Sequence, residues 1–327
     1  MSLTLHEQWR TTDAMQFRQV HSLGKSRYLL SGGIDCPTYP KTKLKCSMAV
    51  IDVATRAYVW NTTLLGHKPF EHSCHTCSLA IGVIPHPYKS DFCGLIALSL
   101  FDGSIDEETT AVDGVIGIAA LSGDAHAYCT SADGGLWVSQ AGSRHAVCRL
   151  PTADQLRALR LTRFDDTHFV ITLQRIRIVG GRGAVDFVHE FRRCDGSLVW
   201  QHATENDSIA TRAESDEVLT YTNAGEDTRS RVECLHAVDG AVKETFVIPT
   251  SIANLVLCED DHFLFSSPQY ELCVFDRRTR KATPASSFPK QFPGWLNIAV
   301  AESERSVLVS KVDNFLSPKT TLASFAF

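Results

Sequence analysis

The sequence of 327 residues lacks the features by which several classes of protein are recognised. It has little net charge: 37 Asp and Glu against 32 Lys and Arg leave −5, which argues against binding nucleic acid by bulk charge. Its apolar runs, such as residues 94–101, are too short to span a bilayer. The first nine residues contain neither the basic nor the apolar segment of a secretory signal. These absences predict a cytoplasmic or nuclear protein with no membrane span.

A disulfide framework is also missing. The eleven cysteines are odd in number and spread thinly through apolar stretches, which is typical of small buried side chains in a reducing compartment. The chain carries no Gly-x-Ser-x-Gly, His-Glu-x-x-His or Walker pattern, so no standard catalytic motif stands out. Long helical patterns are scarce, and short runs of Val, Ile, Leu, Phe and Thr alternate with turn residues instead.

Acidic turns recur between pairs of these short runs. Their last residues are Asp124, Asp166, Asp216, Asp261 and Glu304, so successive turns are about 42 to 50 residues apart. Residues 22–24 form a weaker early member, about two periods before Asp124. Spacing at a fixed period is the signature of a repeat architecture.

A second series of turns follows the first in phase. Its clearest members are the Asp-Gly pairs at Asp102, Asp195 and Asp239, and Asp-Gly favours a tight turn between strands. Weaker members lie at residues 54–56, 141–142 and 278–280. Two of the strand–turn–strand segments end in tryptophan, at Trp60 and Trp200.

Two series of turns with one period near 45 residues predict an all-β protein, a seven-bladed β-propeller of four-stranded blades. Seven blades of that size account for nearly the whole chain, whereas the alternative, a β-sandwich with irregular turns, explains no period. The segments ending at Trp60 and Trp200 resemble the last two strands of blades in the WD40-like and quinoprotein-like propeller repeats. No Gly-His and Trp-Asp pair recurs, so the resemblance does not separate these classes.

The prediction is one propeller domain over residues 1–327. The approximate blades are residues 10–62, 68–112, 114–152, 154–204, 207–249, 251–288 and 294–327, the last completed by residues 2–9 from the other end of the chain. Pairing between strands from the two ends of the chain, which we call the seam, closes the ring, and neither end is then left as a free edge strand.

Long loops between second and third strands would gather on the face opposite the turns, which we call the loop face. Loops on a rigid scaffold carry binding more often than the scaffold does, and several of these loops are basic with interspersed aromatic residues. The candidate partner-binding residues are Tyr39, Lys41, Lys43, Lys45, Tyr88, Lys89, Arg175, Arg177, Arg182 and Phe315. They would suit acidic or phosphorylated peptides of other proteins. The alternative is a set of solvated loops whose charge only maintains solubility.

Cys74 and Cys77 form a single Cys-x-x-Cys motif, which is half of a zinc site and needs a second pair. By residue type alone, Cys36 and Cys46 could supply that second pair. In the repeat register, however, Cys74 and Cys77 occupy a turn, while Cys36 and Cys46 flank a loop on the other face, a strand length away. The prediction is a plain turn with no metal, and zinc at Cys74 and Cys77 stays open as an alternative.

First strands line the channel of a propeller, and here they are largely apolar, with Asn254 and Asn297 as the only inward candidates worth naming. The prediction is therefore a non-catalytic scaffold without a cofactor, a subunit of an intracellular complex that binds other proteins. Two alternatives remain: a hydrolase of lactonase or esterase type with a metal in the channel, and a module that binds RNA or phosphate groups through the basic loops. The net charge does not favour nucleic acid.

Overall fold

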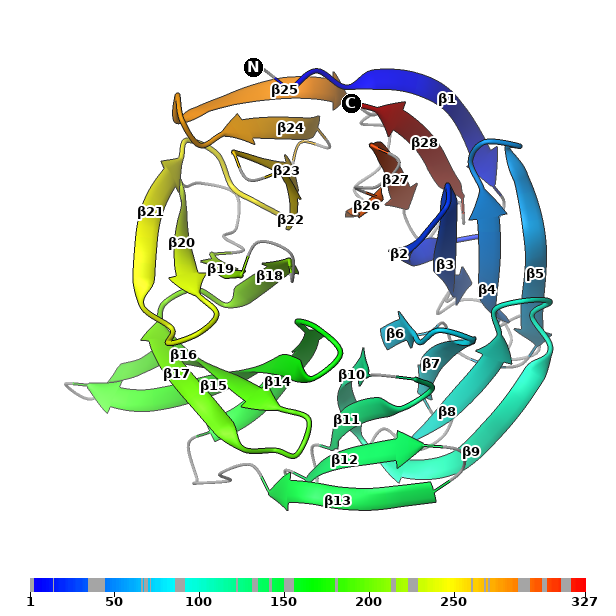
Figure 1. The fold of residues 1–327 in the computed structure, drawn as a ribbon, viewed down its shortest axis with the longest axis horizontal. Helices are drawn as coiled ribbons and strands as arrows, with labels where there is room; N and C mark the ends of the chain where they lie inside the picture. The colour runs from blue at the N-terminus through cyan, green and yellow to red at the C-terminus, as the bar shows by residue number, and fades with distance from the viewer. Residues whose placement is uncertain are drawn as a thin grey trace.

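The computed structural model is a ring of seven antiparallel four-stranded sheets around a central opening (Figure 1). It describes the chain except for residues 1–2, 14, 35–44, 66, 68–69, 71, 86–91, 122, 131–134, 141–142, 150–155, 180–181, 213–215, 223–228, 260, 268, 270, 288–294, 302–304 and 313–318. Every element in the described part is a strand. The predicted all-β, seven-bladed propeller is confirmed.

Each sheet is one blade, and its four strands run outward from the opening in chain order. The innermost strands of blades one to seven are β2 (Phe17–Gly24), β6 (His72–His75), β10 (Val115–Ala120), β14 (Leu156–Arg163), β18 (Ser208–Arg212), β22 (Asn254–Glu259) and β26 (Trp295–Ala301). The second strands are β3 (Arg27–Ile34), β7 (Leu79–Pro85), β11 (His126–Thr130), β15 (His168–Val179), β19 (Glu217–Tyr221), β23 (His262–Ser266) and β27 (Ser306–Val312).

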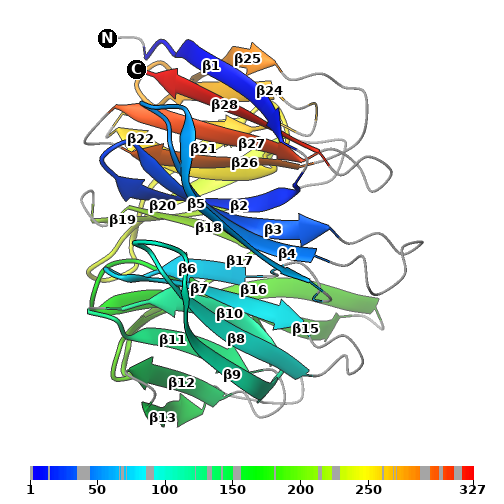
Figure 2. The same cartoon turned by 90° about the vertical axis from the view of Figure 1, so that its right-hand side faces the viewer.

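The outer half of each blade repeats the same order. The third strands are β4 (Lys45–Asp52), β8 (Phe92–Ser99), β12 (Gly135–Gln140), β16 (Arg182–Arg193), β20 (Ser230–His236), β24 (Glu271–Asp276) and β28 (Thr320–Ala326). The outermost strands are β5 (Ala57–Leu65), β9 (Ile105–Asp113), β13 (Ser143–Arg149), β17 (Leu198–Thr204), β21 (Val242–Ile248), β25 (Lys281–Ser287) and, for blade seven, β1 (His6–Asp13). Strands cross the thickness of the ring, so turns and longer loops lie at its two faces (Figure 2).

Blade seven is closed by the N-terminal strand, as the sequence predicts. β1 pairs antiparallel with β28 from His6 opposite Ala326 to Asp13 opposite Thr320. The two ends of the chain therefore lie side by side at the top of Figure 1. Pairing across the seam covers the edge that β28 would otherwise expose.

The two series of turns occupy the predicted places. Acidic turns connect first and second strands, for example between β14 and β15, although residues 302–304 lie outside the described part. The Asp-Gly turns connect third and fourth strands, with φ of +73° at Gly103, +85° at Gly196 and +71° at Gly240. Only glycine adopts this left-handed backbone without strain. Residues 141–142 also lie outside the described part.

Among the described residues, the hydrophobic core forms seven clusters, each where two neighbouring blades face one another. Between blades five and six, for example, Phe246 meets Phe263 and Phe275 with ring centroids 5.5 and 5.4 Å apart. Burial of apolar surface therefore holds each blade to both of its neighbours.

Tryptophans on three outermost strands tie one blade to the next. In each tie the indole N–H donates to a backbone carbonyl in the turn after the third strand of the following blade: Trp9 to Val53 (3.1 Å), Trp60 to Leu100 (2.9 Å) and Trp200 to Ala237 (2.7 Å). A Cβ on Gly240 would lie 2.7 Å from Trp200, so the glycine also leaves room for the ring. These ties explain the strand–turn–Trp segments of the sequence.

Candidate functional site

The strongest candidate site is the central opening, into which β14 sends a charged side chain. Arg160 is exposed, and no ion pair to it exists among the described residues. Burial, together with the positive charge of Arg160, lowers the pKa of His72 in blade two to about 4. Burial also lowers the pKa of His189 in blade four to about 4, with Arg160 again among the charges that act on it. Because Arg160 is exposed on β14, the innermost strand of blade four, its side chain borders the opening.

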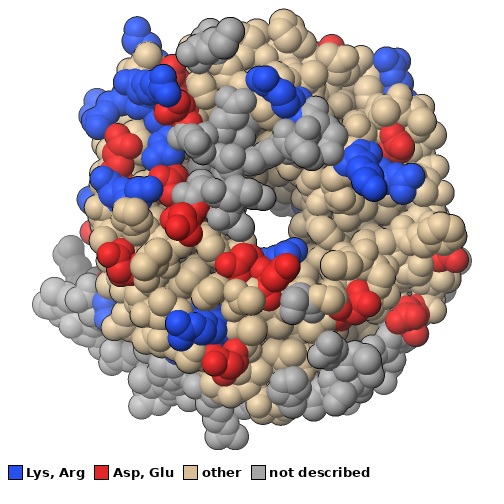
Figure 3. Space-filling view, viewed as in Figure 1, with Lys and Arg blue, Asp and Glu red and all other residues tan. Residues whose placement is uncertain are grey.

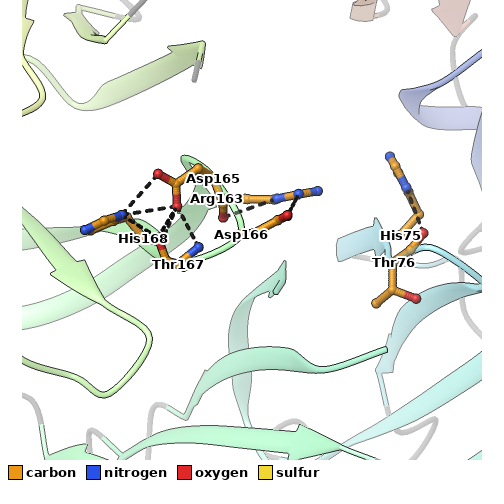
Figure 4. A network of polar contacts seen from close by, with 7 residues as sticks. All are labelled: His75, Thr76, Arg163, Asp165, Asp166, Thr167 and His168. Carbon is orange, nitrogen blue, oxygen red and sulfur yellow. Dashed lines mark hydrogen bonds and ion pairs between the residues drawn. The ribbon is translucent and has the colours of Figure 1, made fainter. Parts of the chain in front are cut away.

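Arg163, three residues further along β14, is already matched by an acid. It forms an ion pair with Asp166 in the following turn, and Figure 4 shows its guanidinium pointing across the opening toward His75 of β6. Burial opposes ionisation of Asp165 beside it, but hydrogen bonds from the backbone and side chain of Thr167 hold the pKa of Asp165 below its ordinary value. Figure 3 shows acidic and basic side chains together at the edge of the opening.

The histidines of the opening are neutral at pH 7. Burial, then the neighbouring His75, lowers the pKa of His21 to about 3. Burial and the charge of Arg163 lower the pKa of His75, against hydrogen bonds that raise it. Among the described residues of this region, Arg160 thus carries a positive charge with which no acid forms an ion pair.

Ser73 on β6 and His21 on β2 form a pairing of nucleophile and base type between two innermost strands. The Ser73 hydroxyl lies 2.8 Å from His21 Nε2, donates to Gln19 Oε1 at 2.7 Å and lies 2.7 Å from the Ser31 hydroxyl. A histidine with a pKa near 3 is a poor general base at neutral pH, and the serine is 7% exposed. The cluster joins blades one and two by hydrogen bonds.

Cys77 lies in the turn after β6, as the register predicts, whereas Cys74 lies within β6 itself and not in the turn. Cys74 is buried, and burial raises the pKa of its thiol to about 12, while Cys77 is exposed. Burial raises the pKa of the Cys46 thiol to about 12 as well, and Cys36 lies outside the described part. Metal ligands are thiolates, so these environments disfavour zinc. The described residues contain no group of three or more His, Cys, Asp or Glu suited to a metal ion.

A buried polar network lies between blades four and five. Glu233 Oε2 lies 3.1 Å from His202 Nε2 and accepts a hydrogen bond from Thr204 at 3.0 Å. The hydrogen bond from His202 has the largest effect on the pKa of Glu233. It outweighs the opposing effect of burial, and the pKa falls to about 2. Asn206 extends the network, since its amide donates to Thr220 at 2.8 Å. The network fixes the end of β17, next to the loop face.

Most of the loop-face residues proposed from the sequence lie where the structure gives no side chains. Tyr39, Lys41, Lys43, Tyr88, Lys89 and Phe315 are outside the described residues, and so are the side chains of Arg177 and Arg182 on β15 and β16. Lys45 begins β4 and is half-buried. Arg175 on β15 is paired with Asp186 of β16 at 2.9 Å, so its charge is matched.

The two inward amides lie on first strands, as expected. Asn254 begins β22, and Asn297 on β26 has a buried Nδ2 without a hydrogen-bond partner among the described atoms. Sequence reasoning missed Arg160, because a register shift between Ala158 and Arg160 interrupts the alternation of β14. A β-bulge re-aims a side chain without any clear mark in the sequence.

The fold is similar to that of a solved WD40 domain. The crystal structure of the C-terminal WD40 domain of Sif2 matches with a TM-score of 0.59 over 98% of this chain and 98% of that chain, at 8% sequence identity. At that identity the likeness shows the fold alone. No family model and no curated protein matches the sequence. Within the part of the chain that the structure describes, no helix has the length and hydrophobicity needed to cross a bilayer.

Proposed function

We propose that the protein is a non-catalytic scaffold of the WD40-like type, a subunit of an intracellular complex that binds acidic or phosphorylated peptides of other proteins. The peptides bind on the loop face and reach into the central opening. The observation that carries the proposal is Arg160, an exposed guanidinium with no acidic partner among the described residues, set among histidines that burial keeps neutral. A guanidinium in such surroundings favours a carboxylate or phosphate ligand.

The basic loops supply the outer part of this surface. In the sequence, Lys41 and Lys43 fall between β3 and β4, and Lys45 begins β4; their charge suits the same acidic ligands as Arg160. The chemistry of Ser73 and His21 supports the non-catalytic part of the proposal, because the serine is engaged by three partners and the histidine is a weak base.

Binding to an array of synthetic peptides tests the proposal. The array carries phosphoserine, glutamate and uncharged versions of each sequence. We expect the phosphorylated and glutamate versions to bind, and both Arg160→Gln and the triple change K41E/K43E/K45E to weaken that binding at least tenfold. Arg56→Gln, which removes an exposed arginine in the turn between β4 and β5, is the matched control and leaves binding unchanged.

Two outcomes would overturn the proposal. One is equal binding of charged and uncharged peptides, or equal binding by wild type and the Arg160→Gln chain. The other is salt-sensitive binding of single-stranded RNA in place of peptides, which would assign the basic loops to nucleic acid.

A further inference from the structure

The hairpin of blade four is longer than its outer neighbour can cover. β15 and β16 have 12 residues each and pair from His168 opposite Arg193 to Val179 opposite Arg182. β17 pairs with β16 only from Phe187 onward, and β14 pairs with β15 only as far as Arg175. The ends of the hairpin stand out beyond the outline of the ring at the lower left of Figure 1.

In the other six blades the outermost strand covers the third strand from its first residue. The first residues of those third strands, each paired with the outer strand, are Lys45, Phe92, Gly135, Ser230, Glu271 and Thr320. Only in blade four does a stretch of the third strand, Arg182–Asp186, have no described strand on its outer side, although β15 pairs with it on the inner side. We call this stretch the open edge.

The open edge presents backbone hydrogen-bonding groups outward. Arg193 N donates to Ser197 O on the side of β17, whereas Cys194 N donates to Thr167 O on the side of β15. β16 keeps an unbroken register with β15 down to Arg182, so its residues alternate between the two sides. By that alternation Gly183 and Val185 direct their N–H and C=O groups away from β15, in line with the end of β17.

Apolar side chains lie beside these groups. Ile176 and Val185 are opposite one another in the register and are 50% and 47% exposed. On the other face of the hairpin, Arg175 donates to Asp186 Oδ2 through Nε at 3.1 Å and Nη2 at 2.9 Å. This cross-strand pair, with Asp186 buried, holds the two strands in register and so pre-forms the edge.

The charge of the hairpin favours an acidic occupant. Residues 175–186 contain three arginines and one aspartate, and the aspartate is already paired with Arg175. A second copy of this chain would bring the same positive charge to the edge, which disfavours edge-to-edge pairing of two copies.

We propose that the open edge is the docking strand for an extended segment of a partner protein that alternates apolar and acidic side chains. The segment adds to blade four as a further strand, bonds to the backbone of Gly183 and Val185, and packs its apolar side chains on Ile176 and Val185. This inference rests on the proposed function and assigns it to one edge of the loop face.

A selection from displayed random 12-residue peptides on the full chain, followed by fluorescence anisotropy with the enriched peptides, tests it. Val185→Pro removes one outward N–H and no bond of the β15–β16 ladder. Val185→Thr, the matched control, keeps that N–H and the branched shape. In a second variant, Asn-Gly replaces residues 176–185 and closes the hairpin directly on Arg175 and Asp186.

We expect enriched peptides with alternating apolar and acidic residues, at least tenfold weaker binding to Val185→Pro and to the shortened hairpin, and less than threefold weaker binding to Val185→Thr. Binding unaffected by Val185→Pro and by the shortened hairpin, but lost in Arg160→Gln, would overturn the docking strand and leave the proposed function standing. A wild-type dimer in sedimentation that Val185→Pro makes monomeric would overturn it in favour of a second copy.

Discussion

The third strands of blades seven and four differ in how fully an outer strand covers them. β28 of blade seven is covered on both sides, by β27 and by β1, from Thr320 to Ala326. β16 of blade four is covered by β15 throughout, but by β17 only from Phe187 onward. Complete pairing occurs where the two ends of the chain must hold the ring closed, and incomplete pairing occurs away from that seam.

The difference is local, because both blades are tied to their neighbours in the same way. Trp9 on β1 ties blade seven to blade one, and Trp200 on β17 ties blade four to blade five. Trp200 also stacks on Phe191 with centroids 5.0 Å apart. The open edge thus lies beyond the part of blade four that holds the ring together, so binding there need not disturb the ring.

Removal of residues 1–13 is expected to have the largest effect. It deletes β1, exposes the edge of β28 and removes the Trp9 tie. Ladder hydrogen bonds contribute about 1 kcal/mol each and a domain is stable by only about 5–15 kcal/mol, so the ring should lose most of its stability. Thermal unfolding followed by circular dichroism measures it. Removal of residues 1–2 alone, which precede β1, is the control. An unchanged melting temperature for the longer deletion would show that the seam does not close the ring.

Trp200→Ala should follow, with a loss of about 3–5 kcal/mol in the free energy of unfolding. The side chain is 7% exposed, and its removal leaves a cavity and an unpaired Ala237 carbonyl. Urea denaturation gives the value. Trp9→Ala is the comparison: its side chain is half-buried, so we expect a smaller loss. Equal losses would mean that burial does not distinguish the two ties.

Acid should destabilise the interior of the ring. Burial and Arg160 lower the pKa of His72 to about 4, whereas an unfolded histidine takes up a proton near pH 6.5. The unfolded state therefore binds more protons between these values. Stability is complete above pH 6.5 and falls toward pH 4, by up to about 1.4 kcal/mol per pH unit for each such histidine.

Urea denaturation at pH 7 and pH 5 measures this dependence. His72→Gln should reduce the slope of stability against pH by the contribution of one histidine. His236→Gln, which alters an exposed histidine, is the control. The shortened hairpin of blade four should keep the wild-type dependence, because the titrating groups line the opening. A His72→Gln chain that loses stability as steeply as wild type would refute the assignment.

The ring was predictable because its signals repeat. Asp-Gly turns and the two Trp-ending segments recur at one period, and a repeated weak signal fixes the blade count where a single one would not. A further series repeats in the second strands, and it carries no turn signal. Small polar residues occupy the fifth position of five second strands: Ser31, Thr130, Thr172, Ser266 and Ser310. Two of them, Ser266 and Ser310, donate to carbonyls of the next first strand, Leu296 O and Phe17 O.

The candidate site was less predictable, since it depends on single irregular features. Arg160 reaches the opening at a register shift in β14, and strand periodicity carries no sign of such a shift. Arg175 looks like a free loop cation in the sequence, but the register places it opposite Asp186. The open edge depends on where β17 stops at Thr204, and strand ends follow from tertiary contacts such as the bond from Thr204 to Glu233.

The smallest effect on stability is expected from the shortened hairpin, in which Asn-Gly replaces residues 176–185. The removed residues that the structure describes pair only with each other, and their apolar side chains Ile176 and Val185 are about half exposed. Arg175 and Asp186 remain to close the new turn. We expect a change within about 1 kcal/mol in the free energy of unfolding, since exposed loops contribute little and closure entropy varies slowly with length. Urea denaturation of the shortened hairpin and of the chain without residues 1–13 measures the smallest and the largest expected loss of stability in the same experiment. A loss of several kcal/mol would place the hairpin within the ring's own packing, and the contrast between blades four and seven would then disappear.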